Sequence, residues 1–140
     1  MPLIYRVMTV DGKCPLVADT ARGLGVRIGG GTNTDIPVDS NGNVAPNTGG
    51  MSVAPRWQDL PLHRIPRRLR NIVPSAVGND KDACWRMGDG PFVEDAVADG
   101  LMLRPDRTAH GNVEPSETMS LVRYRGFIAA TREVWEVDEN

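Results

Sequence analysis

"LIYRVMTV", residues 3–10, is the stretch of sequence that decides the fold. It is rich in β-branched and aromatic side chains, and the turn pair Asp11-Gly12 follows it, a pattern typical of a β-strand. Arg6 lies in the middle of this apolar run. We therefore predict a strand over residues 3–10 that carries a single arginine.

Length and composition set the scale of the rest. The 140 residues fit one domain, 1–140, by the usual size of roughly 100 to 200 residues per domain. The 40% hydrophobic and 24% charged residues are typical of a globular protein. The 15 Gly and 11 Pro together make up a larger share of the 140 residues than the average of about 12%. This excess predicts many turns and short strands rather than long helices.

Charge and cysteine content indicate where the protein acts. A net charge of -2 gives no overall attraction to nucleic acid or to a lipid surface. Cys14 and Cys84 are 70 positions apart in a chain without an apolar signal region, which favours buried thiols in a reducing cytosol. No run approaches the ~18 apolar residues that cross a bilayer. We expect a cytoplasmic protein that leaves its cell, if at all, without a cleavable signal.

The remaining elements are short. Residues 13–50 hold small apolar pieces between turns, and "MSVA" at 51–54 reads as a short buried strand. Repeated prolines over 56–74 exclude a long helix, leaving about two turns at "RRLRNIV", residues 67–73. "ACWRM" and "LMLR" predict strands. One helix begins at Ser120, and its apolar face comprises Leu121, Tyr124, Ile128, Thr131 and Trp135. Together they predict an α+β domain of short strands with one or two helices.

Several common sites have no support in this sequence. The two histidines and two cysteines show no spacing typical of zinc ligands, so we expect no metal site. "GGGTNTD", residues 29–35, lacks the Gly-Lys-Ser/Thr ending of a P-loop and the G-x-G-x-x-G of a dinucleotide fingerprint. It is interpreted as a flexible turn.

A serine hydrolase built on Ser52 is one alternative. "GMSVA", residues 50–54, differs from the nucleophile elbow G-x-S-x-G only at Ala54. An elbow requires a helix directly after the serine, whereas here the strand continues and then breaks at a proline. This alternative needs Ser52 within hydrogen-bond reach of His110, with an aspartate behind the histidine.

A basic cluster runs from Arg56 to Arg70. It has only Trp57 as an aromatic residue, whereas nucleic-acid sites usually have a wider basic surface or a stacking platform. A solvated face is the simplest interpretation. One or two of these arginines could still contact a phosphate, or the face could bind a partner.

Four separated segments suit a nucleotide: "YR" in the first strand, "NTGGMSV" at 47–53, "HGNVEP" at 110–115 and "TMSL" at 118–121. Arg6 can hold a pyrophosphate oxygen, and a glycine turn lets backbone amides approach a ligand. Ser52 can brace that arrangement. Glu114, expected just after a strand, can stabilise positive charge that develops on a ribose. The set fits cleavage of a nicotinamide–ribose bond.

"YR", "APNTGGMSV" and "HGNVEPSETM" resemble, in the same order, segments of a family of small type VI secretion effector toxins with an ADP-ribosyltransferase-like fold. The likeness runs from residue 3 to the terminal helix, with 11–40 and 67–105 aligning loosely. Its most specific motifs are T-G-G-x-S-V, residues 48–53, and H-x-x-aliphatic-x-P-x-x-x-M, residues 110–119.

The resemblance implies a split β core around a cleft for NAD, with Arg6, Ser52 and Glu114 in the Arg-Ser-Glu roles of that fold. Two departures stand out. Met51-Ser52-Val53 replaces the S-T-S motif, and the family need not have an acid at the position of Glu114, so His110 is the alternative ribose contact. A neutralising immunity protein and a macromolecular acceptor of ADP-ribose are the implied partners.

The resemblance also places Tyr5, Thr48, Gly49 and Gly50 at the cofactor, and we expect a positive φ at Gly50. Each residue has a structural alternative. Arg6 could be paired with an acid, Ser52 could bond to the preceding turn, and His110 could simply end a loop. The rival function is a non-catalytic module that keeps the fold and binds a partner.

Overall fold

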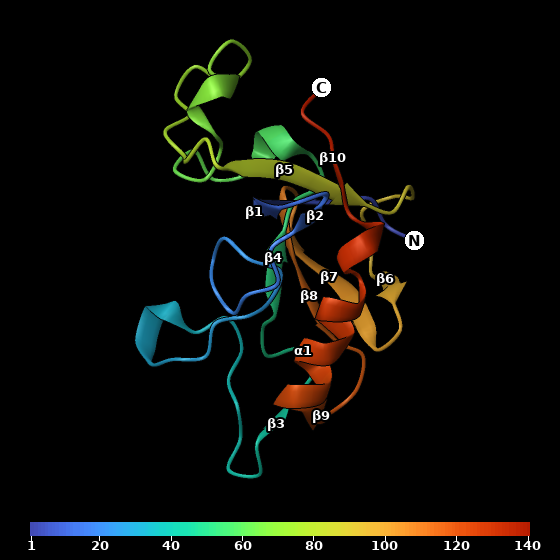
Figure 1. Ribbon diagram of the computed structural model, residues 1–140. Helices are drawn as coiled ribbons and strands as arrows, with labels where there is room; N and C mark the ends of the chain where they lie inside the picture. The colour runs from blue at the N-terminus through green and yellow to red at the C-terminus, as the bar shows by residue number, and fades with distance from the viewer.

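The computed structural model describes residues 1–140 and is built mainly from antiparallel strands with one helix (Figure 1). The strands are β1 (Ile4–Asp11), β2 (Cys14–Pro15), β3 (Asn43–Val44), β4 (Met51–Val53), β5 (Asp82–Met87), β6 (Asp95–Ala98), β7 (Leu101–Arg107), β8 (His110–Pro115), β9 (Met119–Ser120) and β10 (Glu136–Val137). The helix is α1 (Leu121–Ala130). The α+β class is confirmed, as are strands over residues 3–10, "MSVA", "ACWRM" and "LMLR".

Two four-stranded sheets meet at β1. One has the order β10-β5-β1-β2 and the other β4-β8-β7-β6, while β3 and β9 form a separate pair. Tyr5 of β1 and Ala54, directly after β4, exchange backbone hydrogen bonds of 2.8 and 3.0 Å. One edge of β1 therefore pairs with β5 along its length, while the other edge reaches β4 at its start and β2 at its end.

Residues 4–8 of β1 are buried on both faces, which explains why apolar residues stand on either side of Arg6. Ile4 and Met8 point into the larger hydrophobic core, whereas Tyr5 and Val7 belong to a smaller core on the opposite face. Arg6 shares the face of Ile4 and Met8 because side chains alternate along a strand. The one cation of the strand is consequently buried.

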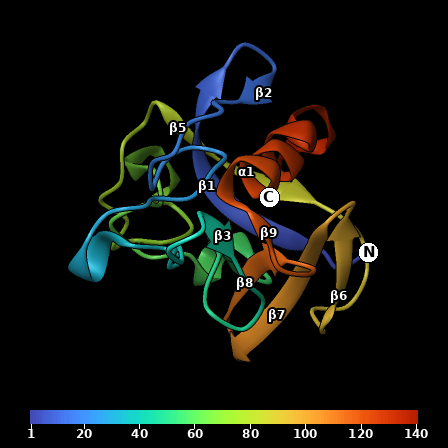
Figure 2. The same cartoon turned by 90° about the horizontal axis from the view of Figure 1, so that it is seen from below.

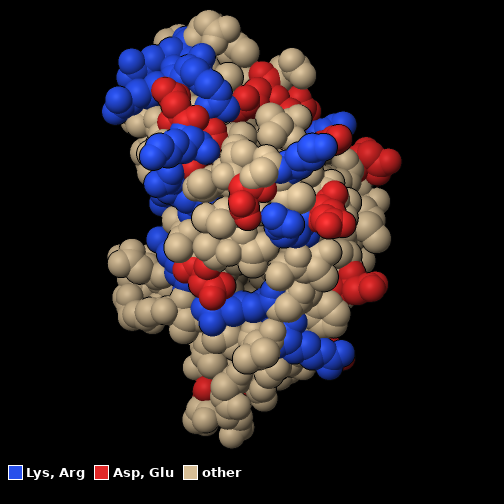
Figure 3. Space-filling model, viewed as in Figure 1, with Lys and Arg blue, Asp and Glu red and all other residues tan.

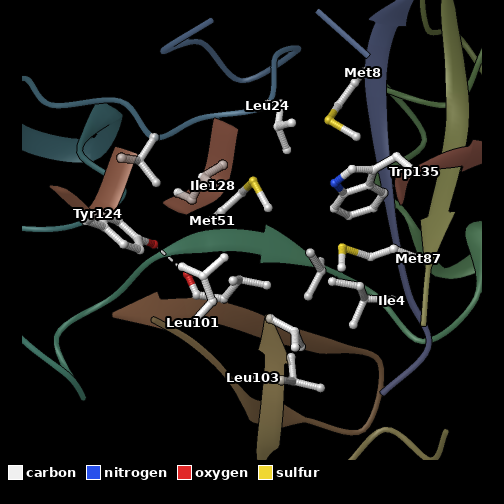
Figure 4. Packing of buried hydrophobic residues seen from close by; sticks show 14 of the residues in the cluster. Ile4, Met8, Leu24, Met51, Met87, Leu101, Leu103, Tyr124, Ile128 and Trp135 are labelled. Carbon is white, nitrogen blue, oxygen red and sulfur yellow. Dashed lines mark hydrogen bonds between the residues drawn. The ribbon is translucent and has the colours of Figure 1, made fainter. Parts of the chain in front are cut away.

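The larger core lies between α1 and the two sheets, with side chains from β1 and β5 as well as from the β4-β8-β7-β6 sheet (Figure 4). Tyr124 and Ile128 come from the helix, and Met51, Leu101 and Leu103 come from the sheet. The buried Tyr124 hydroxyl donates a hydrogen bond to the Val113 carbonyl, the dashed line in Figure 4. This bond fixes the helix to the middle of β8.

α1 begins where the sequence predicts. The Ser120 hydroxyl accepts from the backbone N–H of Arg123 at 3.1 Å, the geometry of an N-cap. The helix contacts β3, β9 and β7. In Figure 2, which views the molecule from below, the helix lies in front of the strands. It ends at Ala130 rather than continuing to Trp135. At this end the hydroxyl and the backbone N–H of Thr131 both donate to the Ile128 carbonyl, at 2.7 and 3.1 Å, and this local bonding competes with continuation of the helix.

Residues 56–81 form a lobe that projects beyond the sheets, at the upper left of Figure 1. The two helical turns expected at 67–73 are wrong: only the 3-10 turn Arg67–Leu69 forms, and isolated turn hydrogen bonds follow it. Pro66 and Pro74 bound this stretch, so a longer helix is not favoured. Trp57, Ile65 and other apolar residues anchor the lobe on the smaller core.

Strand pairing extends further than the sequence predicts. β8 continues through Pro115, so Glu114 lies inside a strand and not after it. β6 was missed because "DAVA" is too short to show a clear pattern. No helix has the length and apolar character needed to cross a membrane.

Gly49 and Gly50 are required for different reasons. The positive φ lies at Gly49, at 136°, and not at Gly50, so the predicted positive φ at Gly50 is wrong. Gly50 is needed for space, since a Cβ there would collide with the Val113 carbonyl of β8. The pairing of β4 with β8 sets this close approach.

We predict that Gly50→Ala lowers the free energy of unfolding by about 1–3 kcal/mol, because the added methyl group forces β4 and β8 apart. Gly126→Ala is the matched control, since nothing lies within 4 Å of a Cβ there. It should raise stability by about 0.5–1 kcal/mol through helix propensity. Urea unfolding of both variants measures this, and equal effects would contradict the packing argument.

Candidate functional site

A cavity of about 490 Å³ lies where β1 and β4 face the lobe of residues 56–81. Its ionisable and polar lining comprises Arg6, Arg27, Asp35, Ser52, Asp59, His63, Arg64, Arg107 and His110. The volume is in the range of small-molecule sites, about 300–1,000 Å³. The structure thus brings together three residues that the sequence singled out: Arg6, Ser52 and His110.

Arg6 is a buried cation held only by carbonyl groups. Its side chain is 6% exposed. Nε donates to the Gly23 carbonyl at 3.1 Å and one terminal nitrogen donates to the Ser52 carbonyl at 2.9 Å. The other terminal nitrogen has longer bonds to Thr20 and Ala21, of 3.4 and 3.5 Å. The alternative of an arginine paired with an acid is therefore wrong.

Burial has an electrostatic consequence at Arg6. It lowers the pKa of the guanidinium to about 10, and the carboxylate of Asp35 at some distance opposes this shift. The group is still charged at neutral pH. A buried charge without a counter-ion is costly, so an anion that enters the cavity would gain from the unpaired cation.

The two acids of the cavity are already neutralised. Arg27 binds Asp35 through its side chain at 3.0 and 3.3 Å and through its backbone N–H at 2.6 Å. Arg56, outside the cavity, binds Asp59 through two bonds of 3.1 Å. Hydrogen bonding to these acids raises the pKa of both Arg27 and Arg56. Four arginines thus face two paired aspartates, which leaves the cavity positive.

Arg64 adds a second available cation. It lines the cavity and forms no ion pair or side-chain hydrogen bond within the protein. It belongs to the basic cluster that the sequence assigned mainly to a solvated face. The suggestion that one or two of these arginines contact a phosphate fits its position.

Ser52 is exposed between the buried Met51 and Val53, as strand alternation predicts. Its carbonyl holds Arg6, and its hydroxyl makes no hydrogen bond within the protein. The alternative that Ser52 bonds to the preceding turn is therefore wrong. The hydroxyl is free for a ligand in the cavity.

His110 begins β8 and lines the same cavity. Its Nδ1 lies 2.6 Å from a carboxylate oxygen of Asp106. No hydrogen bond joins it to Ser52. The aspartate–histidine pair that a serine hydrolase needs is therefore present, but the required serine–histidine contact is not. β4 also runs into Pro55 and a 3-10 turn rather than into the helix of a nucleophile elbow.

Glu114 does not line the cavity. It is 4% exposed, and its Oε1 accepts from the Asn47 N–H at 2.7 Å and lies 2.9 Å from Nε of Arg104. Its carboxylate is therefore enclosed by an ion pair and a loop. The expectation that Glu114 joins Arg6 and Ser52 in one pocket is wrong, because the pairing of β7 with β8 turns it toward Arg104.

The other expected ligand contacts also lie outside the cavity lining. Tyr5 faces away from Arg6, and its hydroxyl donates to Asp138 at 2.7 Å. Burial raises the pKa of Tyr5 to about 12, and the bond to Asp138 adds to that rise. The Thr48 hydroxyl donates to the Ala45 carbonyl at 2.7 Å.

The glycine pair acts through Asp35. The Gly50 N–H donates to the Asp35 carbonyl at 2.9 Å, and a Cβ at Gly49 would collide with the same carbonyl. The turn therefore positions the segment whose carboxylate lines the cavity. The segment "GGGTNTD" therefore supplies Asp35 to the cavity. Its interpretation as a flexible turn did not predict this.

No motif in the sequence pointed to four residues of the cavity: Arg27, Asp35, His63 and Arg107. They reach the cavity from a long loop, from the lobe and from the end of β7. No cluster of three or more His, Cys, Asp or Glu side chains is arranged to hold a metal ion.

No protein-family model matches the chain, and no curated protein shows significant sequence similarity to it.

We predict that inorganic pyrophosphate stabilises the protein against heat, because it would supply the counter-ion that Arg6 lacks. At ten times its Kd a ligand adds about 1.4 kcal/mol. Arg64→Ala should weaken the effect, whereas Arg67→Ala, outside the cavity, should leave it unchanged. Thermal melts with and without pyrophosphate measure this. Equal stabilisation of all three proteins would exclude the cavity as the anion site.

Proposed function

We propose that the chain is an NAD-binding toxin with an ADP-ribosyltransferase-like fold, which transfers ADP-ribose or cleaves NAD in the cytoplasm of a target cell. One observation carries the proposal: a buried arginine without a carboxylate partner faces a cavity that also contains Ser52 and His110. These residues come from three of the segments that resemble the type VI secretion effector toxins. The two sheets that diverge from β1 are compatible with the split β core of that fold.

The charges of the cavity suit a dinucleotide. Arg6 and Arg64 are the cations available to a pyrophosphate, since Arg27 is already bound to Asp35. Guanidinium groups bind phosphate oxygens with directional, charge-assisted hydrogen bonds. The free Ser52 hydroxyl offers a further donor. A ligand with two negative phosphates would use the excess of positive charge that the cavity contains.

The carboxylate of the Arg-Ser-Glu scheme needs a substitute in this chain. Glu114 is bound to Arg104 and Asn47, and the two cavity aspartates are also paired. His110 is the one residue of β8, the strand that carries Glu114, that lines the cavity. We assign it the contact with the ribose side of the substrate.

The rest of the resemblance leads to two partners. A macromolecular acceptor would receive ADP-ribose, and a neutralising immunity protein would protect the producing cell. Delivery by a specialised secretion system belongs to the same proposal. Each of these follows from the likeness to the toxin family and rests on the activity of the cavity.

A second candidate is a non-catalytic module that binds an acidic protein through the lobe. Residues 56–81 carry six cationic and two acidic side chains in a chain of net charge -2. Arg67, Arg70 and Lys81 form no ion pairs, and Figure 3 shows Lys and Arg gathered over this lobe at the upper left. Exposed Leu62 and Val77 lie side by side there, since the Val77 N–H donates to the Leu62 carbonyl. Arginine and aliphatic groups together suit a protein interface.

We predict that the wild-type protein releases nicotinamide from NAD, and that Ser52→Ala and Arg6→Met each reduce the rate by about 10²-fold or more. Ser52→Ala should keep wild-type stability because its hydroxyl has no partner in the protein. Thermal melts check that Arg6→Met is folded. Arg67→Ala is the control with an arginine lost outside the cavity. A folded wild type that releases no nicotinamide would contradict the enzyme and favour the binding module.

A further inference from the structure

Strand β7 contains a β-bulge at Asp106, close to its turn into β8. Pro105 pairs with Gly111 and Arg107 pairs with His110, so Asp106 is the extra residue of β7. A bulge redirects the side chain of its extra residue, and bulges are common beside active sites. Here the carboxylate is directed at His110, with 2.6 Å between Oδ1 and Nδ1.

This contact determines which nitrogen of His110 carries a proton in the neutral ring. A carboxylate accepts a hydrogen bond, so the proton lies on Nδ1 and Nε2 keeps its lone pair. Because His110 lines the cavity, Nε2 is the nitrogen available to a ligand there. The arrangement is that of a histidine base oriented by an aspartate, as in acyl-transfer enzymes.

The surrounding charges are consistent with a base. Arg107 is the one cation beside the dyad, and its Nε lies 3.9 Å from the carboxylate of Asp106. Arg6, Arg64 and Arg107 also line the cavity, while its two aspartates are paired with Arg27 and Arg56. No free carboxylate in the cavity competes with His110 for the proton.

We propose that His110, held by the positioning residue Asp106, is the general base of the cavity, and that its acceptor is an oxygen nucleophile, either water or a hydroxyl group. This inference rests on the proposed NAD chemistry. A carboxylate acceptor would need no base, and a guanidinium acceptor holds its proton far too tightly for imidazole to remove. A neutral imidazole with an aspartate behind it does activate hydroxyl groups.

The step balances without a further reactant. The acceptor oxygen forms a bond to the anomeric carbon of the nicotinamide ribose as the carbon–nitrogen bond breaks. The electron pair of that bond goes to the pyridinium nitrogen, so nicotinamide leaves uncharged. The acceptor proton moves to Nε2 of His110, and Asp106 stabilises the imidazolium until the proton passes to solvent.

The test is steady-state NAD hydrolysis, with water as acceptor, by the full chain and four variants. His110→Ala should lower kcat by about 10²–10⁴-fold, the usual contribution of a general base. Imidazole added to the buffer should restore part of that activity. Asp106→Asn should lower kcat with little change in KM, and Asp106→Glu should recover part of the loss. Glu117→Gln, an exposed acid with no partner, is the charge-matched control.

The outcomes separate this inference from the proposed function. Hydrolysis that persists unchanged in His110→Ala and Asp106→Asn would overturn the base while leaving the NAD activity in place. Loss of activity in His110→Ala without rescue by imidazole, together with a raised KM in Asp106→Asn, would also overturn it and indicate a binding role. A wild type that neither binds nor cleaves NAD would overturn both proposals.

Discussion

The burial of the Arg6 guanidinium is the constraint on which the rest of the site depends. Its hydrogen bonds to the Gly23 and Ser52 carbonyls tie the first strand to a distant loop and to β4. Backbone oxygens solvate the charge but do not neutralise it, so the cavity keeps an unpaired cation at its floor. A carboxylate in place of these carbonyl groups would neutralise the guanidinium and remove the reason for an anion to bind.

Residues that look functional in the sequence divide into two groups in the structure. Arg6, Ser52 and His110 reach the cavity, whereas Gly49, Gly50 and Glu114 build its support. Gly50 lets β4 approach β8, and the Glu114 carboxylate binds Arg104 of β7 and the Asn47 N–H of the turn that leads into β4. A motif residue can therefore matter because it shapes the backbone, even where its own side chain does not line the cavity.

Features that depend on neighbouring residues were predictable. Strand alternation predicts that Ser52 is exposed, and the preference of serine for the N-cap predicts that α1 starts at Ser120. Features that depend on long-range register were not. A one-residue bulge directs Asp106 at His110, and pairing between β7 and β8 joins Glu114 to Arg104. Asp35 reaches the cavity through loop contacts that leave no periodic pattern. The α+β class could therefore be predicted from the sequence, whereas the places of Arg27, His63 and Arg107 in the cavity could not.

The central claim is that the cavity around Arg6 binds NAD. Calorimetric titration of the purified protein with NAD tests this most directly, because it measures binding without requiring an acceptor. We expect saturable binding of one NAD per chain with a Kd of 1 mM or tighter, worth at least about 4 kcal/mol. Heat no greater than that of dilution, from a protein shown to be folded, would contradict the claim.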